Sequence, residues 1–186
     1  MKNNKSLYLF LAKCAGLYLI WNIAYFGWIA SHTNIEMWIT SKTAMVSTRL
    51  LNLVGYEASY IDVPHSSESK QSVSLILVDE VPLLYIADSC NAFTLMVLFM
   101  GFIIAYPGNW KHKMWFIAAG CLAVFLINVI RVQFLIYNYM YYHSWFEFNH
   151  KYTFTIAVYL CVFYFWMVWA NSFGKERKIL KFRSQS

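Results

Sequence analysis

Charged residues are scarce in this chain, and the cysteine and glycine patterns that mark metal or nucleotide sites are missing. Only 13% of the 186 residues are charged, whereas a soluble domain has about a quarter. The four cysteines form no CxxC pair and no metal-ligand spacing, which argues against a zinc site or a disulfide framework. No glycine-rich phosphate loop or dinucleotide fingerprint is present. The sequence therefore predicts neither a metal nor an organic cofactor.

Hydrophobic sequence is what the chain has in abundance. Hydrophobic residues account for 60% of the chain and aromatic residues for 20%, which is typical of a membrane protein. A net charge of +6 could suit nucleic acid, but the basic residues lie at the ends of apolar runs, where membrane topology requires them. We therefore expect the lipid bilayer to be a partner and expect no nucleic acid.

Apolar runs predict an all-α transmembrane fold with about four spanning helices in one integral membrane domain, residues 1–186. The runs cover about residues 7–30, 91–106, 114–139 and 152–170. A hydrocarbon core needs roughly 20 helical residues, and the first run is too long for the apolar part of a cleaved signal peptide. The second run is short, and Pro107, Gly108 and Asn109 end it before a basic interfacial turn at residues 110–113.

A polar, mixed segment separates the first two spans. Within it, apolar residues recur at near-helical spacing: Ile35, Trp38, Ile39, Val46, Leu50 and Leu53. Charged residues lie between them, so we predict an outward-facing amphipathic helix that lies along the membrane surface and ends at Gly55. A polar loop at residues 64–71 follows.

Two β-rich runs come next, Val73–Val78 and residues 81–86. Asp79 and Glu80 join them, which predicts a small β-hairpin leading toward the second span. Pro82 restricts its strand to an edge, because proline has no backbone N–H to donate to a neighbouring strand.

Basic residues are distributed unequally between the two sides of this arrangement. One side holds Lys2, Lys5, Lys111, Lys113 and a basic tail at residues 171–186. The other side holds Lys42, Arg49, Lys70 and Lys151 together with most of the acidic residues. The positive-inside rule then predicts that both termini are cytoplasmic and that residues 31–87 and 139–150 face outward.

Cys90 is a candidate nucleophile because of its place at the start of the second span. We predict that Ser89 caps this helix and that Cys90 is its first or second residue. The partial positive charge of a helix N-terminus favours the thiolate, although Asp88 opposes this effect. The alternative is that Cys90 is simply a small buried residue, as most free cysteines are.

Arg131 interrupts the third apolar run, where a lipid-facing charge near the midplane would be costly. The 16 residues from Trp115 to Arg131 extend about 24 Å, which brings Arg131 close to the outer boundary, the predicted depth of Cys90. Asn128 shares its helix face, and its amide is suited to hold the guanidinium or a substrate carbonyl. The alternative is that Arg131 snorkels outward as a structural anchor.

His150 lies at the outer start of the fourth span, and His143 on the same loop is its competitor. Taken alone, an interfacial histidine is more often a packing residue. Together, Cys90, His150 and Arg131 would supply what acyl transfer from a peptide needs: an attacking thiolate, a proton shuttle and a cation for the oxyanion. His32 and His65 are interpreted as solvated loop residues.

The ordered set Cys90, Asn128-x-x-Arg131 and His150 resembles the exosortase/archaeosortase family of integral-membrane cysteine transpeptidases. The resemblance covers about residues 50–170, and its lead-in to the hairpin is Leu50, Leu51, Leu53, Gly55 and Tyr56. It implies that Cys90 is the nucleophile, Arg131 the transition-state stabiliser and His150 the acid/base. Two features depart from many members: Asn91, Ala92 and Phe93 replace Ser-Gly and a following arginine, and the chain has fewer spans.

That resemblance also implies the substrate and the location. The family processes exported proteins whose C-terminal tails carry a short recognition motif, a membrane helix and a basic end. We therefore expect a sorting protease or transpeptidase in the prokaryotic cytoplasmic (inner) membrane, multi-pass, with its active site on the outer face. The alternative is a non-catalytic membrane assembly or scaffold protein. A transporter fragment is a weaker third hypothesis, because the spans are few and no internal repeat is evident.

Overall fold

Three helical runs in the described part of the chain are long and apolar enough to cross a membrane. The computed structural model describes residues 4–29, 33–63, 73–87, 90–142, 144 and 146–173. The three runs, Tyr8–Trp28, Trp110–Tyr141 and Phe146–Ser172, agree with the predicted first, third and fourth spans. At the predicted second span lies α4 (Phe93–Ala105), whose 13 residues extend about 20 Å, less than the roughly 30 Å of a hydrocarbon core. A fourth crossing stays a prediction.

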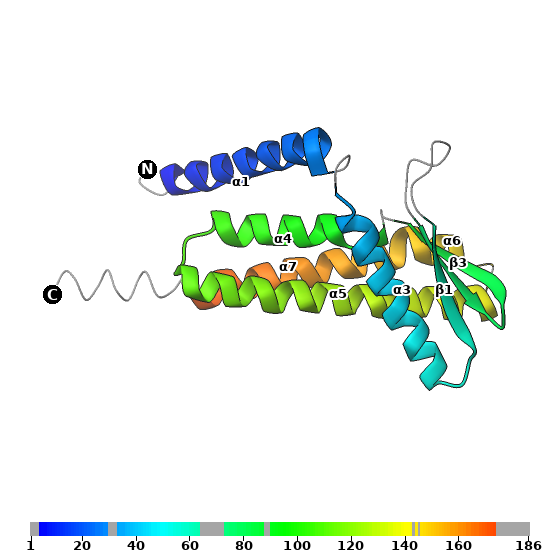
Figure 1. The fold of residues 1–186 in the computed structure, drawn as a ribbon. Coiled ribbons are helices and arrows are strands. Elements are labelled where there is room, and N and C mark those ends of the chain that lie inside the picture. Colours follow the sequence, from blue (N-terminus) through cyan, green and yellow to red (C-terminus); the bar gives the residue numbers. More distant parts are fainter. Residues whose placement is uncertain are drawn as a thin grey trace. The chain divides into compact units, whose positions relative to one another are not determined.

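The long runs consist of α-helices and short π-helices. They are α1 (Asn4–Ala24) with η1 (Tyr25–Ile29), α5 (Trp110–Tyr141), and α6 (Phe146–Phe148) with η4 (Asn149–Thr153) and α7 (Phe154–Phe173) (Figure 1). Contacts divide the chain into one unit of residues 1–32, 94–123 and 160–186 and another of residues 33–93 and 124–159. Helices α5 and α7 contribute residues to both units. The prediction that the chain forms a single domain therefore stays a prediction.

Aromatic rings pack together in the first unit. Phe102 of α4 stacks on Trp166 of α7 with ring centroids 4.4 Å apart, and Phe10 of α1 meets Phe102 edge-on at 5.5 Å. Aromatic pairs of this kind stabilise a fold beyond the area they bury. Gly120 of α5 faces the fully buried Phe99, and a Cβ at that position would overlap the ring. A residue without a side chain is therefore needed there.

The predicted basic turn at residues 110–113 is wrong, because these residues form the first turn of α5. Asn109 caps that turn, since its Oδ1 accepts a hydrogen bond from the Lys111 N–H at 3.0 Å. Lys113 is buried, and its Nζ donates to the backbone carbonyl of Ile104 at 2.8 Å. That carbonyl belongs to the last turn of α4, whose C=O groups have no partners within the helix.

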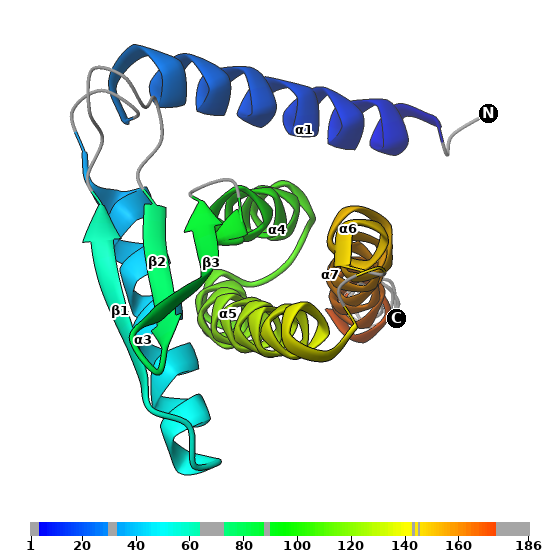
Figure 2. The ribbon, with the colours of Figure 1, turned by 90° about the vertical axis from the view of Figure 1, so that its right-hand side faces the viewer.

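A helix and a three-stranded antiparallel sheet make up much of the second unit. The elements are α3 (Ile35–Leu53), β1 (Ala58–Val63), β2 (Val73–Val78) and β3 (Val81–Ala87), with strand order β1-β2-β3. Figure 2 shows α3 lying across one face of the sheet. The predicted hairpin is β2–β3, and its two turn residues, Asp79 and Glu80, have φ of 51° and 64°, as a type I′ turn requires. Pro82 lies in an edge strand, as predicted.

Strand β1 is an addition to the predicted hairpin. It pairs with β2 along its whole length, and the Ser74 hydroxyl donates to the Asp62 carboxylate across the two strands at 2.5 Å. The chain between α3 and β1 is held by Asn52, whose side chain donates to the backbone carbonyl of Ala58 and accepts from its N–H. The predicted polar loop at residues 64–71 lies outside the described residues.

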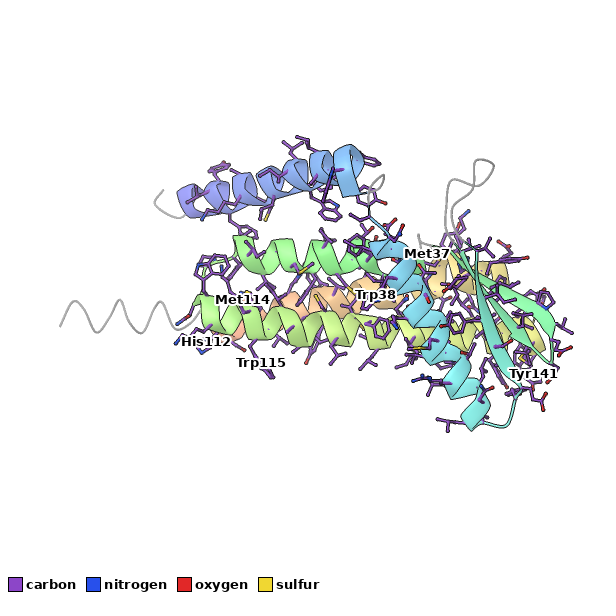
Figure 3. All side chains as sticks on the ribbon, in the orientation of Figure 1. Met37, Trp38, His112, Met114, Trp115 and Tyr141 are labelled. Atoms are coloured by element: carbon purple, nitrogen blue, oxygen red, sulfur yellow. The ribbon has the colours of Figure 1, made fainter. Side chains whose placement is uncertain are left out.

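Helix α3 forms where predicted, and Gly55 ends it with φ of 101°. Its two terminal hydrogen bonds, Tyr56 N–H to the Leu51 carbonyl and Gly55 N–H to the Asn52 carbonyl, are those of a Schellman motif. The Tyr56 hydroxyl lies 2.8 Å from that of Tyr141 on α5, and this hydrogen bond raises the pKa of Tyr56. Figure 3 labels Tyr141, the last residue of α5.

The face that α3 buries differs from the predicted apolar stripe. The buried residues are mostly small or hydroxyl-bearing: Ile39, Thr40, Thr43, Ala44, Ser47, Thr48 and Leu51. Of the predicted stripe, Ile39 is buried, while Trp38 is 62% exposed and Leu53 82% exposed. Trp38 and Leu53 therefore lie outside the core of this unit. The location of α3 along the membrane surface stays a prediction.

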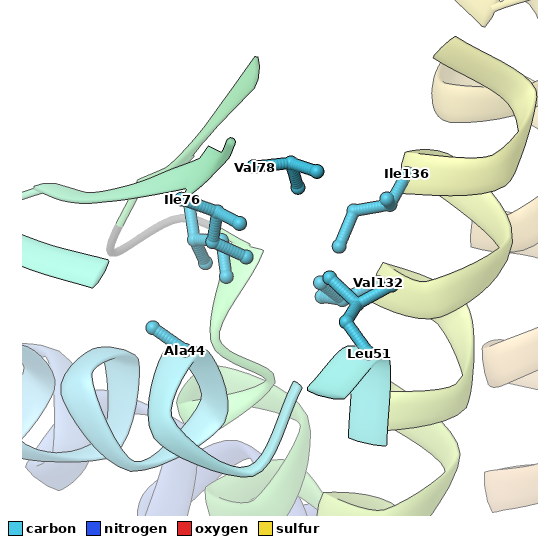
Figure 4. Packing of buried hydrophobic residues seen from close by; sticks show 7 residues of the cluster. Ala44, Leu51, Ile76, Val78, Val132 and Ile136 are labelled. Atoms are coloured by element: carbon cyan, nitrogen blue, oxygen red, sulfur yellow. The ribbon is translucent and has the colours of Figure 1, made fainter. Parts of the chain in front are cut away.

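The core of the second unit lies between α3, the sheet and α5. Its buried members are Ala44, Leu51, Ile76, Val78, Ile86, Val132 and Ile136 (Figure 4). Gln133 adds a polar tie from α5, because its Nε2 donates to the Ser47 carbonyl of α3 at 2.8 Å. Cys90 packs against the edge of this cluster. The core that joins α3, the sheet and α5 therefore lies next to the candidate nucleophile.

Candidate functional site

Cys90 lies between the end of β3 and the start of α4. Helix α4 begins at Phe93, so the prediction that Cys90 is the first or second helical residue is wrong. The predicted cap, Ser89, lies outside the described residues. Instead, the Asn91 Oδ1 accepts a hydrogen bond from the Phe93 N–H at 2.9 Å, and Ala92 adopts a left-handed φ of 63°. A sharp bend just before the helix therefore carries the half-buried Cys90.

Asn91 fastens this bend to α3. Its side chain is 1% exposed, and its Nδ2 donates to the Glu36 carbonyl at 3.0 Å and to the Thr40 hydroxyl at 3.1 Å. The Thr40 hydroxyl in turn donates to the Glu36 carbonyl at 2.9 Å. A buried amide must satisfy its donors within the protein, and Asn91 does so on the hydroxyl-bearing face of α3.

Asn128 holds Cys90 from the opposite element, α5. It is fully buried, and its Nδ2 donates to the backbone carbonyl of Cys90 at 3.1 Å. The sequence suggested that this amide holds a guanidinium or a substrate carbonyl, but in the structure it donates to the backbone of Cys90. Its Oδ1 is buried and has no hydrogen-bond partner among the described residues.

His150 reaches Cys90 from the π-helix η4. Its Nε2 lies 3.7 Å from the Cys90 Sγ, within hydrogen-bonding range of a sulfur atom. Single-turn π-helices occur frequently at functional sites. The Phe146 ring stacks on the imidazole with centroids 5.8 Å apart and an interplanar angle of 1°, and Tyr139 meets Phe146 edge-on. The orientation of the imidazole is therefore set by packing on its face.

Arg131 follows Asn128 by three residues on α5, so the two share a helix face. Its guanidinium is half-buried, and the Nε has no hydrogen-bond partner in the described part of the chain. No hydrogen bond between the described residues joins Arg131 to Cys90 or to His150. The structure thus brings Cys90, His150 and Asn128 into contact and leaves Arg131 one turn further along the helix.

Three of the histidines considered in the sequence lie outside the residues that the structure describes, and two residues near Cys90 were not predicted to belong to the site. His143, the competitor of His150, is among the undescribed residues, as are His32 and His65. Asn91 and Thr40 were not predicted to contribute. The only signal for Asn91 was that it follows Cys90 directly. Within the described ranges, no group of three or more histidine, cysteine, aspartate or glutamate residues is arranged to hold a metal ion.

Comparisons with known proteins bear on this arrangement. No curated protein and no solved structure matches the chain. The family model of the transmembrane exosortases matches residues 7–168, which is most of the chain and includes Cys90, Arg131 and His150. This match and the apolar helical runs agree with the family resemblance drawn from the sequence. The chain belongs to the transmembrane exosortase family.

Proposed function

We propose that this membrane protein is a sorting cysteine transpeptidase with Cys90 as its nucleophile and His150 as its general acid and base. The observation that carries the proposal is the 3.7 Å separation between the Cys90 Sγ and the His150 Nε2. A thiol beside an imidazole is a common arrangement for covalent acyl transfer, because the histidine can take the thiol proton. Stacking of His150 on Phe146 supports the same assignment, since it limits the directions in which the ring can point.

In the proposed reaction the Cys90 thiolate attacks a peptide carbonyl carbon of the substrate. The C–N bond then breaks as the tetrahedral intermediate collapses, and His150 donates a proton to the leaving amine. The substrate's N-terminal part stays on Cys90 as a thioester, and its C-terminal membrane segment departs. An incoming amine or water, deprotonated by His150, attacks the thioester carbonyl and restores the free thiol.

Arg131 is assigned to the oxyanion that forms during both steps. Its Nε is buried without a partner among the described residues, so the side chain has hydrogen-bonding capacity left for a ligand. A fixed guanidinium in a site that excludes water stabilises developing negative charge more than it would in water. Because Arg131 lies one turn beyond Asn128, which holds the Cys90 carbonyl, it shares the helix face that supports the nucleophile.

We assign the substrates to exported proteins with a C-terminal sorting signal that includes a membrane helix. The location that fits such substrates is the outer face of a prokaryotic cytoplasmic membrane, with both termini of this chain in the cytoplasm. The uneven distribution of basic residues supports this orientation.

The test is co-expression of the chain with a membrane-tailed candidate substrate, comparing the native protein with Cys90→Ala. Loss of the tail, followed by gel shift and mass, is expected only with the native protein, and the product mass gives the cleavage site and the acceptor. A matched substrate left intact by both folded proteins would contradict the proposal and favour the scaffold alternative. Cleavage that persists in Cys90→Ala would exclude Cys90 as the nucleophile.

A further inference from the structure

We propose that Asn91 and Thr40 are positioning residues that hold Cys90 at its working distance from His150. This inference rests on the proposed function, because it assigns the two residues to the same thiol–imidazole pair. Each acts through the backbone of the bend that carries Cys90.

The first step is the hydrogen bonding of Asn91. An asparagine amide has two N–H donors and one acceptor oxygen, and this side chain uses both donors on α3 and the oxygen on the Phe93 N–H. Because the backbone carbonyl of Glu36 can only accept, the group facing it must be the Nδ2. The amide therefore has one consistent orientation, and no shorter or purely accepting side chain reproduces its three bonds.

Rigidity of the support is the second step. Helix α3 is held to the sheet by the core around Ala44 and Ile76, and to α5 by Gln133. Thr40 and Asn91 are both almost fully buried, so water does not compete for their hydrogen bonds. The bend is thus tied to α3 through Asn91, just as its Cys90 carbonyl is tied to α5 through Asn128.

Distance is the third step. Misplacement of a reacting group by about 1 Å can lower a rate by about a hundredfold. Cys90 directly precedes Asn91, so a bend released from α3 moves the Sγ relative to the Nε2 of His150. Loss of one ordinary hydrogen bond between the bend and α3 would lower the equilibrium constant between held and released positions of the bend about fivefold.

A matched pair of substitutions on α3 tests the inference. Thr40 and Thr43 are both fully buried, and each hydroxyl donates to the carbonyl four residues earlier at 2.9 Å. Only the Thr40 hydroxyl also accepts from Asn91. Thr40→Val and Thr43→Val therefore each lose one hydrogen bond to a backbone carbonyl of α3. Only Thr40→Val also loses the hydrogen bond that the Thr40 hydroxyl accepts from Asn91.

Two readouts are compared in the full-length protein in lipid nanodiscs. The first is the rate of Cys90 alkylation by iodoacetamide at fixed pH, followed by mass spectrometry of the Cys90 peptide. The second is kcat and KM for cleavage of the membrane-tailed substrate. We expect Thr40→Val to lower the alkylation rate and kcat more than twofold and up to about fivefold, with little change in KM. Thr43→Val should stay within twofold of the native protein, and Thr40→Ser should restore the native values.

Equal effects of the two valine substitutions, or no recovery in Thr40→Ser, would overturn the inference. If Thr40→Val does not fold, Asn91→Asp serves instead, since it keeps the size of the side chain and removes both donors; native alkylation and kcat in that variant would also overturn it. The alkylation rate needs no substrate. A failure of the proposed function, seen as cleavage independent of Cys90, is therefore distinguishable from a failure of the positioning role.

Discussion

Replacement of Phe146 by leucine is the sharpest test of how the site holds its histidine. Leucine keeps most of the apolar volume but removes the flat ring that lies parallel to the imidazole of His150 with centroids 5.8 Å apart. An aromatic pair of this kind is worth about 0.5–1.5 kcal/mol beyond its buried area. At about 1.36 kcal/mol per factor of ten, Phe146→Leu should lower kcat roughly two- to twelvefold. KM should change little, because Phe146 is expected to act on the imidazole and not on the substrate.

Phe148 supplies the control, because it belongs to the same short helix, α6. Its ring is 53% exposed and contacts Tyr152, 5.5 Å away between centroids, rather than His150. Phe148→Leu should therefore keep native kcat in the same cleavage assay. The reasoning is refuted if Phe146→Leu cleaves at the native rate, or if both substitutions lower kcat equally.

Three further predictions concern the remaining site residues and the packing of the first unit. Arg131→Lys keeps the charge but loses the forked guanidinium, so cleavage should fall severely, and normal turnover in that variant would rule out a bidentate role. His150→Ala should abolish cleavage while the protein still folds, whereas retained activity would mean that another residue moves the proton. Gly120→Ala should lower the thermal midpoint, by the equivalent of about 1–3 kcal/mol, because its Cβ would overlap the buried Phe99 ring. Gly101→Ala is the matched control, since a Cβ there has no atom within 4 Å and alanine favours a helix by about 1 kcal/mol.

Local patterns predicted several elements of the structure correctly. Apolar runs predicted the long helices, and Gly55 predicted the end of α3. The two polar residues between β-rich runs predicted the hairpin. Each of these depends on a periodicity or a turn within a few neighbouring residues. The pairing of Cys90 with His150 was predicted by a different route, from the shared outer depth of the two residues and from the family resemblance.

The features that the sequence did not predict depend on contacts between residues far apart in the chain. Strand β1 is stabilised by pairing with β2. The buried face of α3 depends on its packing against the sheet and on its hydrogen bonds with Asn91. None of these contacts is visible in a short stretch of sequence. The apolar stripe of α3 did not indicate Thr40, which the structure buries and which accepts a hydrogen bond from Asn91, 51 residues away. Likewise, Asn91 moves the start of α4 to Phe93, so the predicted position of Cys90 in the helix was wrong.

The distance in sequence between Cys90 and His150 also determines when each residue is made during synthesis of the chain. Cys90 and His150 are 60 residues apart, and a ribosome adds about 5–20 residues per second. The thiol therefore leaves the ribosome roughly 3–12 s before its imidazole, and the helical run that carries the imidazole is still to be inserted. Under the proposed function, a nascent or truncated chain that ends before residue 146 holds the nucleophile without its proton acceptor. Such a chain is expected to be inert toward the secreted proteins that pass it during their own export.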